Sequence, residues 1–339
     1  MIGLLALSLF ASCDFEKINT NEFEMLPEEG KMDGISVGGP ITALQKCVVP
    51  VGTQDDGTNV ANEYQVAYHL AADCWSGYFA QNNNWNSGRN NLTYFLMDGW
   101  VSASYTSAYT KVIPLWQDIK IKTEKDFPEA YALAQILKVS TWHKATDMFG
   151  PIPYKEAGKG LISVPYDSQA DVYKYMFEDL TNAIGVLTNA LEHGTTKLLP
   201  NADAVYGGNV KKWIVYANSL MLRLAMRVYY ADEAMSKKYV LQAVNNPYGV
   251  MQSKGDEAKM EKGAGLTFIN NIEILSNQYN ECRMGSSMQA YLGGYEDPRL
   301  PKYFTESEAY FAKKVGQYGS YMAVPTGNIA CLLYTSPSP

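Results

Sequence analysis

Histidine is almost absent from this sequence, which leaves little material for a metal site. Only three of the 339 residues are histidines. His143 and Asp147 lie four residues apart, the spacing of a ligand pair on one helical face, but no third ligand is evident. We therefore interpret the pair as core or surface residues, and we expect no metal ion and no cofactor.

Known catalytic signatures are lacking as well. The chain contains no GxxxxGKS or GxxxxGKT phosphate-binding loop and no GxSxG nucleophile elbow. A pair of carboxylates for glycoside hydrolysis cannot be recognised from spacing alone. The residues thus indicate no catalytic site, although a surface glycoside hydrolase stays open as an alternative function.

Positive charge is in the minority. The 28 lysines and arginines are outnumbered by 35 aspartates and glutamates, for a net charge of −7, and no basic run stands out. Nucleic acid is therefore not an expected partner. The hydrophobic share of 47% and the charged share of 19% are ordinary for a globular protein, and the length suffices for one large core or two domains.

Long apolar runs are confined to the N-terminus. Residues 2–12 are almost all apolar or small, a stretch too short to span a bilayer but long enough for the hydrophobic region of a secretion signal. The most apolar later stretch, ANSLMLRLAMRVYY, is interrupted by Arg223 and Arg227. The mature chain is therefore not expected to cross a membrane.

A cysteine ends this leader. The FASC segment of residues 10–13 resembles the lipobox of bacterial lipoproteins, in which a peptidase cleaves before the cysteine and the sulfur carries a diacylglyceryl group. An ordinary leader with an incidental cysteine is the alternative. We predict a signal peptide over 1–12, lipid attachment at Cys13 and a lipidated tether over 13–34.

Acidic residues follow this cysteine. Asp14 and Glu16 resemble the surface-export signal of Bacteroidota lipoproteins. An N-terminus that carries several acyl chains gives lasting membrane attachment, which a single chain does not. The predicted location is therefore the outer membrane, at the cell surface and lipid-anchored.

The remaining cysteines are few. Cys47, Cys74 and Cys282 allow at most one disulfide among them, and the sequence leaves open whether it forms. Cys331 begins CLLYTSPSP, which breaks from the preceding pattern and resembles translated sequencing-adapter read-through. We therefore predict a non-native tail over 331–339 and expect the natural protein to continue further.

Amphipathic helices are predicted where apolar residues recur every three or four positions. The first of these helices places Trp75 on its core-facing side. From about Tyr248 onward the pattern becomes mixed, which predicts an irregular capping region. The predicted helices cover approximately residues 60–79, 105–119, 128–147, 168–192, 210–231 and 237–245.

Loops join these helices, and small residues occupy positions of close packing. Antiparallel pairs of this kind favour a tetratricopeptide-like stack, although the spacing is too irregular for a clean period of about 34 residues. The predicted fold class is mainly α: a tetratricopeptide-like helical repeat scaffold with irregular loops and a mixed capping region.

Aromatic residues are plentiful, and one loop concentrates the groups that bind sugars. The 25 tyrosines and 6 tryptophans offer flat apolar faces with polar edges, which suit sugar rings but also helical cores. The segment QNNNWNSGRNN, residues 81–91, has no helical period and is rich in Asn and Gly. It combines an aromatic ring for the sugar face with amide and guanidinium groups for hydroxyls. The alternative is a polar turn with Trp85 folded back onto the core. The ligand-binding residues that we predict are Trp85, Asn82, Asn84, Arg89 and Tyr78.

Three segments resemble the SusD/RagB family. They are ATDMFGPIPYKEA (145–157), KKWIVYANSLMLRLAMRVY (211–229) and EDPRLPKYF (296–304), and they occur in the family's order after a lipoprotein start. The resemblance covers roughly residues 13–325. Because family members usually run about half as long again, we expect a SusD-like domain over 35–330 that is incomplete at its C-terminus.

The resemblance also implies a function. Members of that family are cell-surface lipoproteins that bind glycan, or sometimes another nutrient such as a peptide, without catalysis. Their helices dock a SusC-like, TonB-dependent outer-membrane barrel, while loops on another face hold the ligand. A tetratricopeptide scaffold without any small-molecule ligand is a further alternative.

The motifs themselves are interpreted as structural. In DMFGPIPY, Gly150 is expected to cap a helix, while Phe149 and Tyr154 pack against the core. Arg223 and Arg227 lie four residues apart and are therefore neighbours on one helical face. We expect these arginines to pair with buried carboxylates or carbonyls rather than with ligand.

Overall fold

The computed structural model is mainly helical, which confirms the predicted fold class. It describes residues 35–50, 63–81, 83–260, 262–263, 266–267, 270–307 and 321–325. Cys13, the segments 1–12 and 13–34, and the tail 331–339 lie outside the described residues, and so does Asn82.

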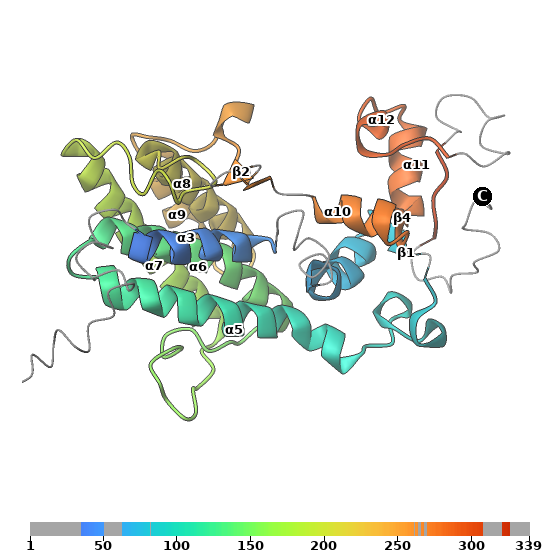
Figure 1. Ribbon diagram of the computed structural model, residues 1–339, viewed down its shortest axis with the longest axis horizontal. Coiled ribbons are helices and arrows are strands. Elements are labelled where there is room, and N and C mark those ends of the chain that lie inside the picture. Colours follow the sequence, from blue (N-terminus) through green and yellow to red (C-terminus); the bar gives the residue numbers. More distant parts are fainter. Residues whose placement is uncertain are drawn as a thin grey trace, which may run out of the picture.

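Most of the long helices form one stack. They are α3 (Ile35–Val48), α5 (Asp98–Thr123), α6 (Pro128–Phe149), α7 (Gln169–Glu192), α8 (Val210–Arg227) and α9 (Glu233–Val244). From α5 to α9 each helix packs against the next, and α3 packs on α5 and α6 (Figure 1). This arrangement of neighbours agrees with the predicted tetratricopeptide-like scaffold.

Local sequence signals begin and end these helices. The side chains of Ser168, Asn209 and Asp232 cap α7, α8 and α9, each accepting a backbone N–H three residues further on at 2.8–3.1 Å. Helix α6 begins with Pro128 and ends at Gly150, whose φ of 74° favours a residue without a Cβ. The predicted starts of α6, α7 and α8 therefore agree with the structure within one residue, whereas the end of α8 and the start of α9 each differ by four residues.

Helix α6 is the central helix of the stack. Its side chains are buried without a break from Ala132 to His143. The largest fully buried aromatic side chains of this core are Trp142, Phe177 and Trp213, each at most 2% exposed. Such continuous burial shows that α6 is packed on more than one side.

Helix α3 is absent from the predicted helices. Gly38, Gly39 and Pro40 lie within it and mask the helical pattern of the sequence. A Cβ on Gly38 would lie 2.8 Å from the Cβ of Ala202, so this glycine allows a close approach. The packing of α3 thus depends on a residue that argues against a helix locally.

A smaller lobe lies beside the stack (Figure 1). Antiparallel strands β1 and β4 join distant parts of the chain there, with Phe79 opposite Met284 and Gln81 opposite Cys282. Helix α5 begins next to this lobe and runs along the stack (Figure 1). The elements of the lobe are η1 (Gln65–Asp73), β1 (Phe79–Gln81), η2 (Trp85–Gly88), η3 (Asn91–Thr93), α10 (Asn271–Glu273), η5 (Ile274–Gln278), β4 (Cys282–Met284), α11 (Ser286–Gly294) and α12 (Leu300–Tyr303).

Short elements follow α9 in the chain. They are η4 (Lys254–Asp256), β2 (Lys262–Gly263) and β3 (Leu266–Thr267), and the two strands pair antiparallel. With the later elements from α10 to α12, they confirm the mixed pattern predicted after Tyr248.

The motifs of the sequence have structural roles. Phe149 packs half-buried against the core and Tyr154 is 5% exposed, as predicted. Arg223 and Arg227 are both exposed, and Arg227 Nε lies 2.9 Å from the Oδ2 of the half-buried Asp147. The predicted carboxylate partner is therefore confirmed for Arg227 only.

Two questions from the sequence concern disulfides and membrane-spanning helices. Cys47, Cys74 and Cys282 are free thiols. Within the described ranges, every helix is too short or too polar to cross a bilayer.

Candidate functional site

A pair of exposed aromatic rings lies on the smaller lobe. Trp75 follows η1 and Tyr94 follows η3, and their rings stack with centroids 6.1 Å apart and planes inclined by 19°. Trp75 is 41% exposed and Tyr94 is 74% exposed. Covering such rings with a ligand removes apolar surface from water, so exposed aromatic groups mark binding surfaces. We call Trp75 and Tyr94 the aromatic plate.

The backbone of η3 holds this plate. The carbonyl of Asn91 accepts hydrogen bonds from Trp75 Nε1 at 2.8 Å and from the backbone N–H of Tyr94 at 3.1 Å. Tyr94 has a φ of 59°, a left-handed conformation that is unfavourable for a residue with a Cβ. Strain of this kind persists only where surrounding structure imposes it, frequently at binding sites.

The exposure of Trp75 shows that its predicted place in the core was wrong. The segment is a π-helix, in which hydrogen bonds span five residues and each turn is wider than in an α-helix. Gln65 and Leu70, five positions apart in this segment, are both buried, which fits the wider turn. Trp75 is turned away from the face that a regular α-helix would have given it.

Trp85 is half-buried beneath the surface of the lobe. Its ring meets Trp100 edge-on, with centroids 5.8 Å apart and planes at 87°. It also packs against the cluster of Leu70, Cys74 and Leu92. This is the folded-back arrangement that the sequence left as an alternative, and a ligand contact for Trp85 stays a prediction.

Several asparagines build the loop rather than line its surface. Asn90 is 2% exposed and donates from Nδ2 to the carbonyl of Trp85 at 2.9 Å, and Asn91 is 1% exposed. Asn84 is exposed, and its side chain makes no capping hydrogen bond. Of the two predicted amides, Asn84 thus faces solvent, and Asn82 lies outside the described residues.

The other predicted residues lie at the surface. The guanidinium of Arg89 lies 5.5 Å from the ring centroid of Phe95, which is 49% exposed. Tyr78, between η1 and β1, is 55% exposed. The structure thus places Tyr78, Asn84 and Arg89 on the surface of the lobe that carries the aromatic plate.

A carboxylate from the distant end of the chain fixes the loop. Glu281 Oε1 accepts from Asn83 Nδ2, and Glu281 Oε2 accepts from Gln65 Nε2, both at 2.8 Å. Each oxygen of the carboxylate therefore has its own amide donor. Glu281 joins η1 to the residue that precedes Asn84 and Trp85, and this bond sets where the loop begins.

A second stacked pair lies on α11. Tyr291 and Tyr295 have ring centroids 6.3 Å apart and planes at 16°, and they are 67% and 79% exposed. The N-terminus of α11 contacts the turn that carries Tyr78, because Gly285 N–H donates to the carbonyl of Tyr78 at 3.0 Å. The smaller lobe thus carries two pairs of exposed, stacked rings.

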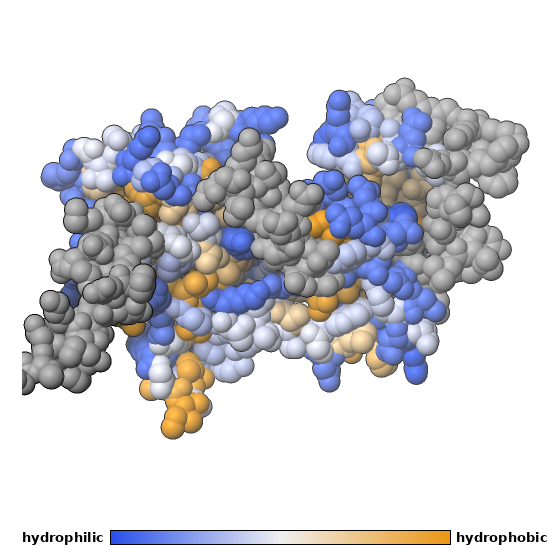
Figure 2. Space-filling view, viewed as in Figure 1, coloured by the Kyte–Doolittle hydropathy of each residue, from blue (hydrophilic) through white to orange (hydrophobic). Residues whose placement is uncertain are grey.

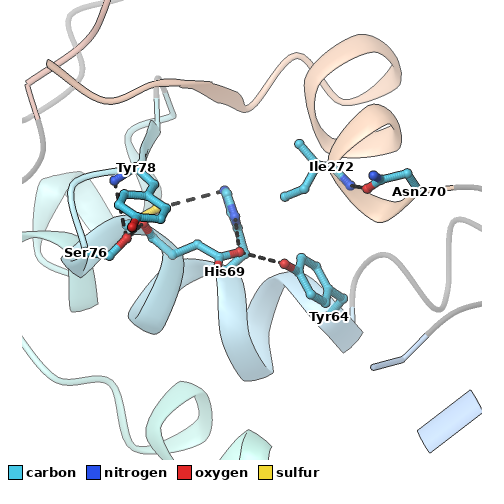
Figure 3. A network of polar contacts seen from close by, with 8 residues as sticks. Tyr64, His69, Ser76, Tyr78, Asn270 and Ile272 are labelled. Atoms are coloured by element: carbon cyan, nitrogen blue, oxygen red, sulfur yellow. Dashed lines mark hydrogen bonds and ion pairs between the residues drawn. The ribbon is translucent and has the colours of Figure 1, made fainter. Parts of the chain in front are cut away.

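A partly buried polar network connects side chains of the lobe (Figure 3). Asp73 Oδ2 accepts from the hydroxyl of Tyr64 at 2.7 Å and lies 3.1 Å from His69 Nδ1. The other ring nitrogen of His69 lies 3.9 Å from the sulfur of Cys74. Cysteine, histidine and aspartate in this order resemble the groups of a thiol catalyst.

The surroundings of this network argue against thiol catalysis. Cys74 and His69 are fully buried, so no substrate reaches the sulfur. Burial, followed by the nearby Cys282 and Asp73, raises the pKa of the Cys74 thiol far above its ordinary value. The thiol therefore stays protonated, and we interpret the network as a structural support for η1.

The residues considered for a metal lie in an ion-pair cluster. His143 Nδ1 is 3.6 Å from Asp147 Oδ2, and Asp147 also accepts from the hydroxyl of Tyr173 at 2.5 Å. In the part of the chain that the structure describes, no three residues of His, Cys, Asp or Glu gather in a metal-binding group.

Some surface residues of this lobe were not predicted from the sequence. Tyr94 lies three residues after the predicted loop, and the capping pattern of NNLT directly before it was a signal for a turn. Glu281, Tyr291 and Tyr295 had no local signal, because their proximity to the loop depends on the pairing of β1 with β4.

Several solved structures are similar to this chain. A chitin-binding SusD homologue from Flavobacterium johnsoniae is 33% identical, with a TM-score of 0.75, over 80% of this chain and 55% of that chain. A SusD homologue from Bacteroides vulgatus is 27% identical, with a TM-score of 0.77, over 87% and 57%. One from Bacteroides uniformis is 29% identical, with a TM-score of 0.74, over 88% and 59%. The chain thus spans little more than half the length of these relatives.

A family model gives the assignment. No curated protein matches the sequence. The model described as "Susd and RagB outer membrane lipoprotein" matches residues 17–330. This description confirms the predicted location at the outer membrane. The chain therefore belongs to the SusD-like family of outer-membrane lipoproteins.

Proposed function

We propose that this protein is a non-catalytic surface receptor that captures oligosaccharides on the aromatic plate of Trp75 and Tyr94. The observation that carries the proposal is the pair of large stacked rings left in water on a SusD-like scaffold. Sugar rings present apolar C–H faces that stack on such aromatic groups, while amides and guanidinium groups bond their hydroxyls. Asn84, Arg89 and Tyr78 lie at the surface of the same lobe and supply these polar groups.

Chitin fragments are the first ligands to test. The structurally similar SusD homologue from Flavobacterium johnsoniae is described as chitin-binding and is 33% identical to this chain. We therefore propose N-acetylglucosamine oligomers as the leading class within a panel of polysaccharides. Calorimetric titration of the panel measures the dissociation constant of each.

The decisive variant is Tyr94→Ala, because Tyr94 is the most exposed ring of the plate. We expect the dissociation constant for a confirmed glycan to rise about tenfold, equivalent to about 1.4 kcal/mol. Tyr230→Ala removes a tyrosine that is 98% exposed on the helical stack and serves as the matched control. An unchanged affinity of Tyr94→Ala would assign the ligand to another surface.

Delivery to a transporter is the second part of the proposal. The partner is a SusC-like, TonB-dependent outer-membrane barrel, which receives the glycan from this lipid-anchored receptor. Co-purification of the full chain with such a barrel from outer membranes supports this step. Release of shortened products from a bound polysaccharide would instead favour a glycoside hydrolase, and envelope partners without glycan binding would favour a scaffold protein.

A further inference from the structure

A hydrophobic loop projects from the helical stack between α6 and α7. Figure 1 shows this loop below α5, and Figure 2 shows hydrophobic side chains at its tip. Leu161 is 50% exposed and Ile162 is 109% exposed, more than any other large apolar residue described. Two adjacent aliphatic side chains at the end of a projecting loop are costly to keep in water. We call Leu161 and Ile162 the loop tip.

The base of the loop is firmly held. Asp167 Oδ2 accepts the backbone N–H groups of Tyr154 and Lys155 at 2.8 and 2.9 Å. The backbone N–H of Asp167 donates to the carbonyl of Ile152 at 3.0 Å. The tip is therefore presented by an anchored loop, at a defined place on the stack.

Glycines shape the turn between this base and the tip. Gly158 has a φ of 79°, and a Cβ there would lie 2.7 Å from the Nε2 of Gln117 on α5. Gly160, directly before Leu161, has a φ of 73°. Left-handed glycines on the way to the tip give the loop its projecting shape.

The shape and size of the tip favour a lipid bilayer over a protein as its partner. Specific protein interfaces bury about 1,000 Å² or more, whereas two aliphatic side chains on a convex loop bury far less. A bilayer interface demands no matching cavity and accepts a few aliphatic groups. Tyr166, at the base, is 63% exposed, and tyrosine suits the headgroup level of a membrane. Lys155 and Lys159 are exposed in the same loop and keep their charges in water.

We propose that Leu161 and Ile162 insert into the interfacial layer of a lipid bilayer and give this outer-membrane lipoprotein a second membrane contact. The predicted tether of residues 13–34 has an extended length of at most about 75 Å, so a lipid at Cys13 keeps the folded part near the surface. A lipid at Cys13 alone does not set the orientation of the folded part. Insertion of the tip fixes which side of the helical stack faces the membrane.

The test uses the full chain with Cys13→Ser, so that no acyl chain contributes to binding. The probe is a vesicle of phosphatidylethanolamine and phosphatidylglycerol, and co-sedimentation measures the partition coefficient. We expect Leu161→Ser with Ile162→Ser to lower partitioning about tenfold, because both inserted side chains are lost. The thermal midpoint should not change, since the tip is solvent-exposed in the folded protein.

A matched control removes two other exposed aliphatic side chains. Leu241 and Val244 on α9 are 47% and 43% exposed. Leu241→Ser with Val244→Ser should leave partitioning as in the Cys13→Ser chain. Equal partitioning of the tip variant and its parent would overturn the proposal. A second result would also overturn it: the parent does not bind vesicles, and the tip variant no longer co-purifies with an outer-membrane barrel. The tip would then be a docking site for a protein.

Discussion

Lys138 on α6 places a positive charge in the centre of the helical stack. It is 5% exposed, and its Nζ lies 2.9 Å from the Oδ2 of Asp179. The same ammonium lies 4.4 Å from the ring centroid of Trp116 and 4.5 Å from that of Tyr154. Burial lowers the pKa of Lys138, while Asp179 acts to raise it. A carboxylate and two aromatic faces thus replace the water that the charge has lost.

Lys138→Met tests this compensation. The change keeps the length of the side chain but leaves Asp179 without its cation, so we expect a loss of about 2–4 kcal/mol in the free energy of unfolding. Urea denaturation measures the loss. Lys159→Met, which breaks the exposed pair with Glu156, should cost less than about 1 kcal/mol. If the two changes lowered the free energy of unfolding equally, the buried pair would contribute no more to stability than the exposed pair.

His143 makes the stability depend on pH. The residue is 5% exposed, and burial lowers the pKa of its imidazole below 6.5, although Asp147 partly offsets this. The folded state then binds the proton less readily than the unfolded state. Stability is therefore complete above about pH 6.5 and falls as the pH drops below that value.

His143→Gln should flatten this dependence. Chemical denaturation at pH 7 and pH 5 compares the variant with the parent chain, and the parent should lose more stability between the two. His193→Gln changes an exposed histidine at the end of α7 and should retain the slope of the parent. A parent chain with equal stability at both pH values would contradict the prediction.

At the scale of elements, the contact between Glu281 and Asn83 fixes the beginning of the candidate loop. Asn83→Asp would set a second carboxylate against Glu281 at a contact of 2.8 Å. We expect this repulsion to raise the dissociation constant for glycan about tenfold and to raise hydrogen exchange over residues 83–91.

A second substitution, which should restore the contact, makes this prediction specific. With Glu281→Gln added to Asn83→Asp, the new amide at position 281 donates to the carboxylate at position 83. Its oxygen still accepts from Gln65, so affinity and exchange should return towards the parent. Glu281→Gln alone should have a small effect, because the amide of Asn83 can turn and accept. If the double variant stayed as weak as Asn83→Asp, the pair would not position the loop.

Elements with a regular period were predictable from the sequence, and those without one were not. Helices α6, α7 and α8 begin at or within one residue of the predicted positions, since caps and apolar spacing agree there. The π-turns of η1 broke the period that assigned Trp75 to the core. The predicted loop does lie on the smaller lobe, but its tryptophan is half-buried, and the aromatic plate is formed by Trp75 and Tyr94 instead. Burial depends on neighbours that are distant in sequence, and no local pattern identifies them.

At the scale of the whole molecule, the smaller lobe depends on the contact between two glycines. Gly285, at the start of α11, has a φ of −72°, which any residue adopts. A Cβ there would nevertheless lie 2.3 Å from the carbonyl oxygen of Gly77. Gly77 and Tyr78 precede β1, so this contact packs the late part of the chain against the turn beside the aromatic plate.

Gly285→Ala should therefore loosen the smaller lobe while the helical stack stays folded. Hydrogen exchange should rise in β1, β4 and α11, but the amides of α6 and α8 should keep their protection, because their core lies in the other part of the molecule. Gly293→Ala is the matched control on the same helix, since a Cβ there meets no atom within 4 Å. Glycan affinity should fall for the first variant alone. A uniform rise in exchange throughout both lobes would instead mean that the molecule unfolds as a single cooperative unit.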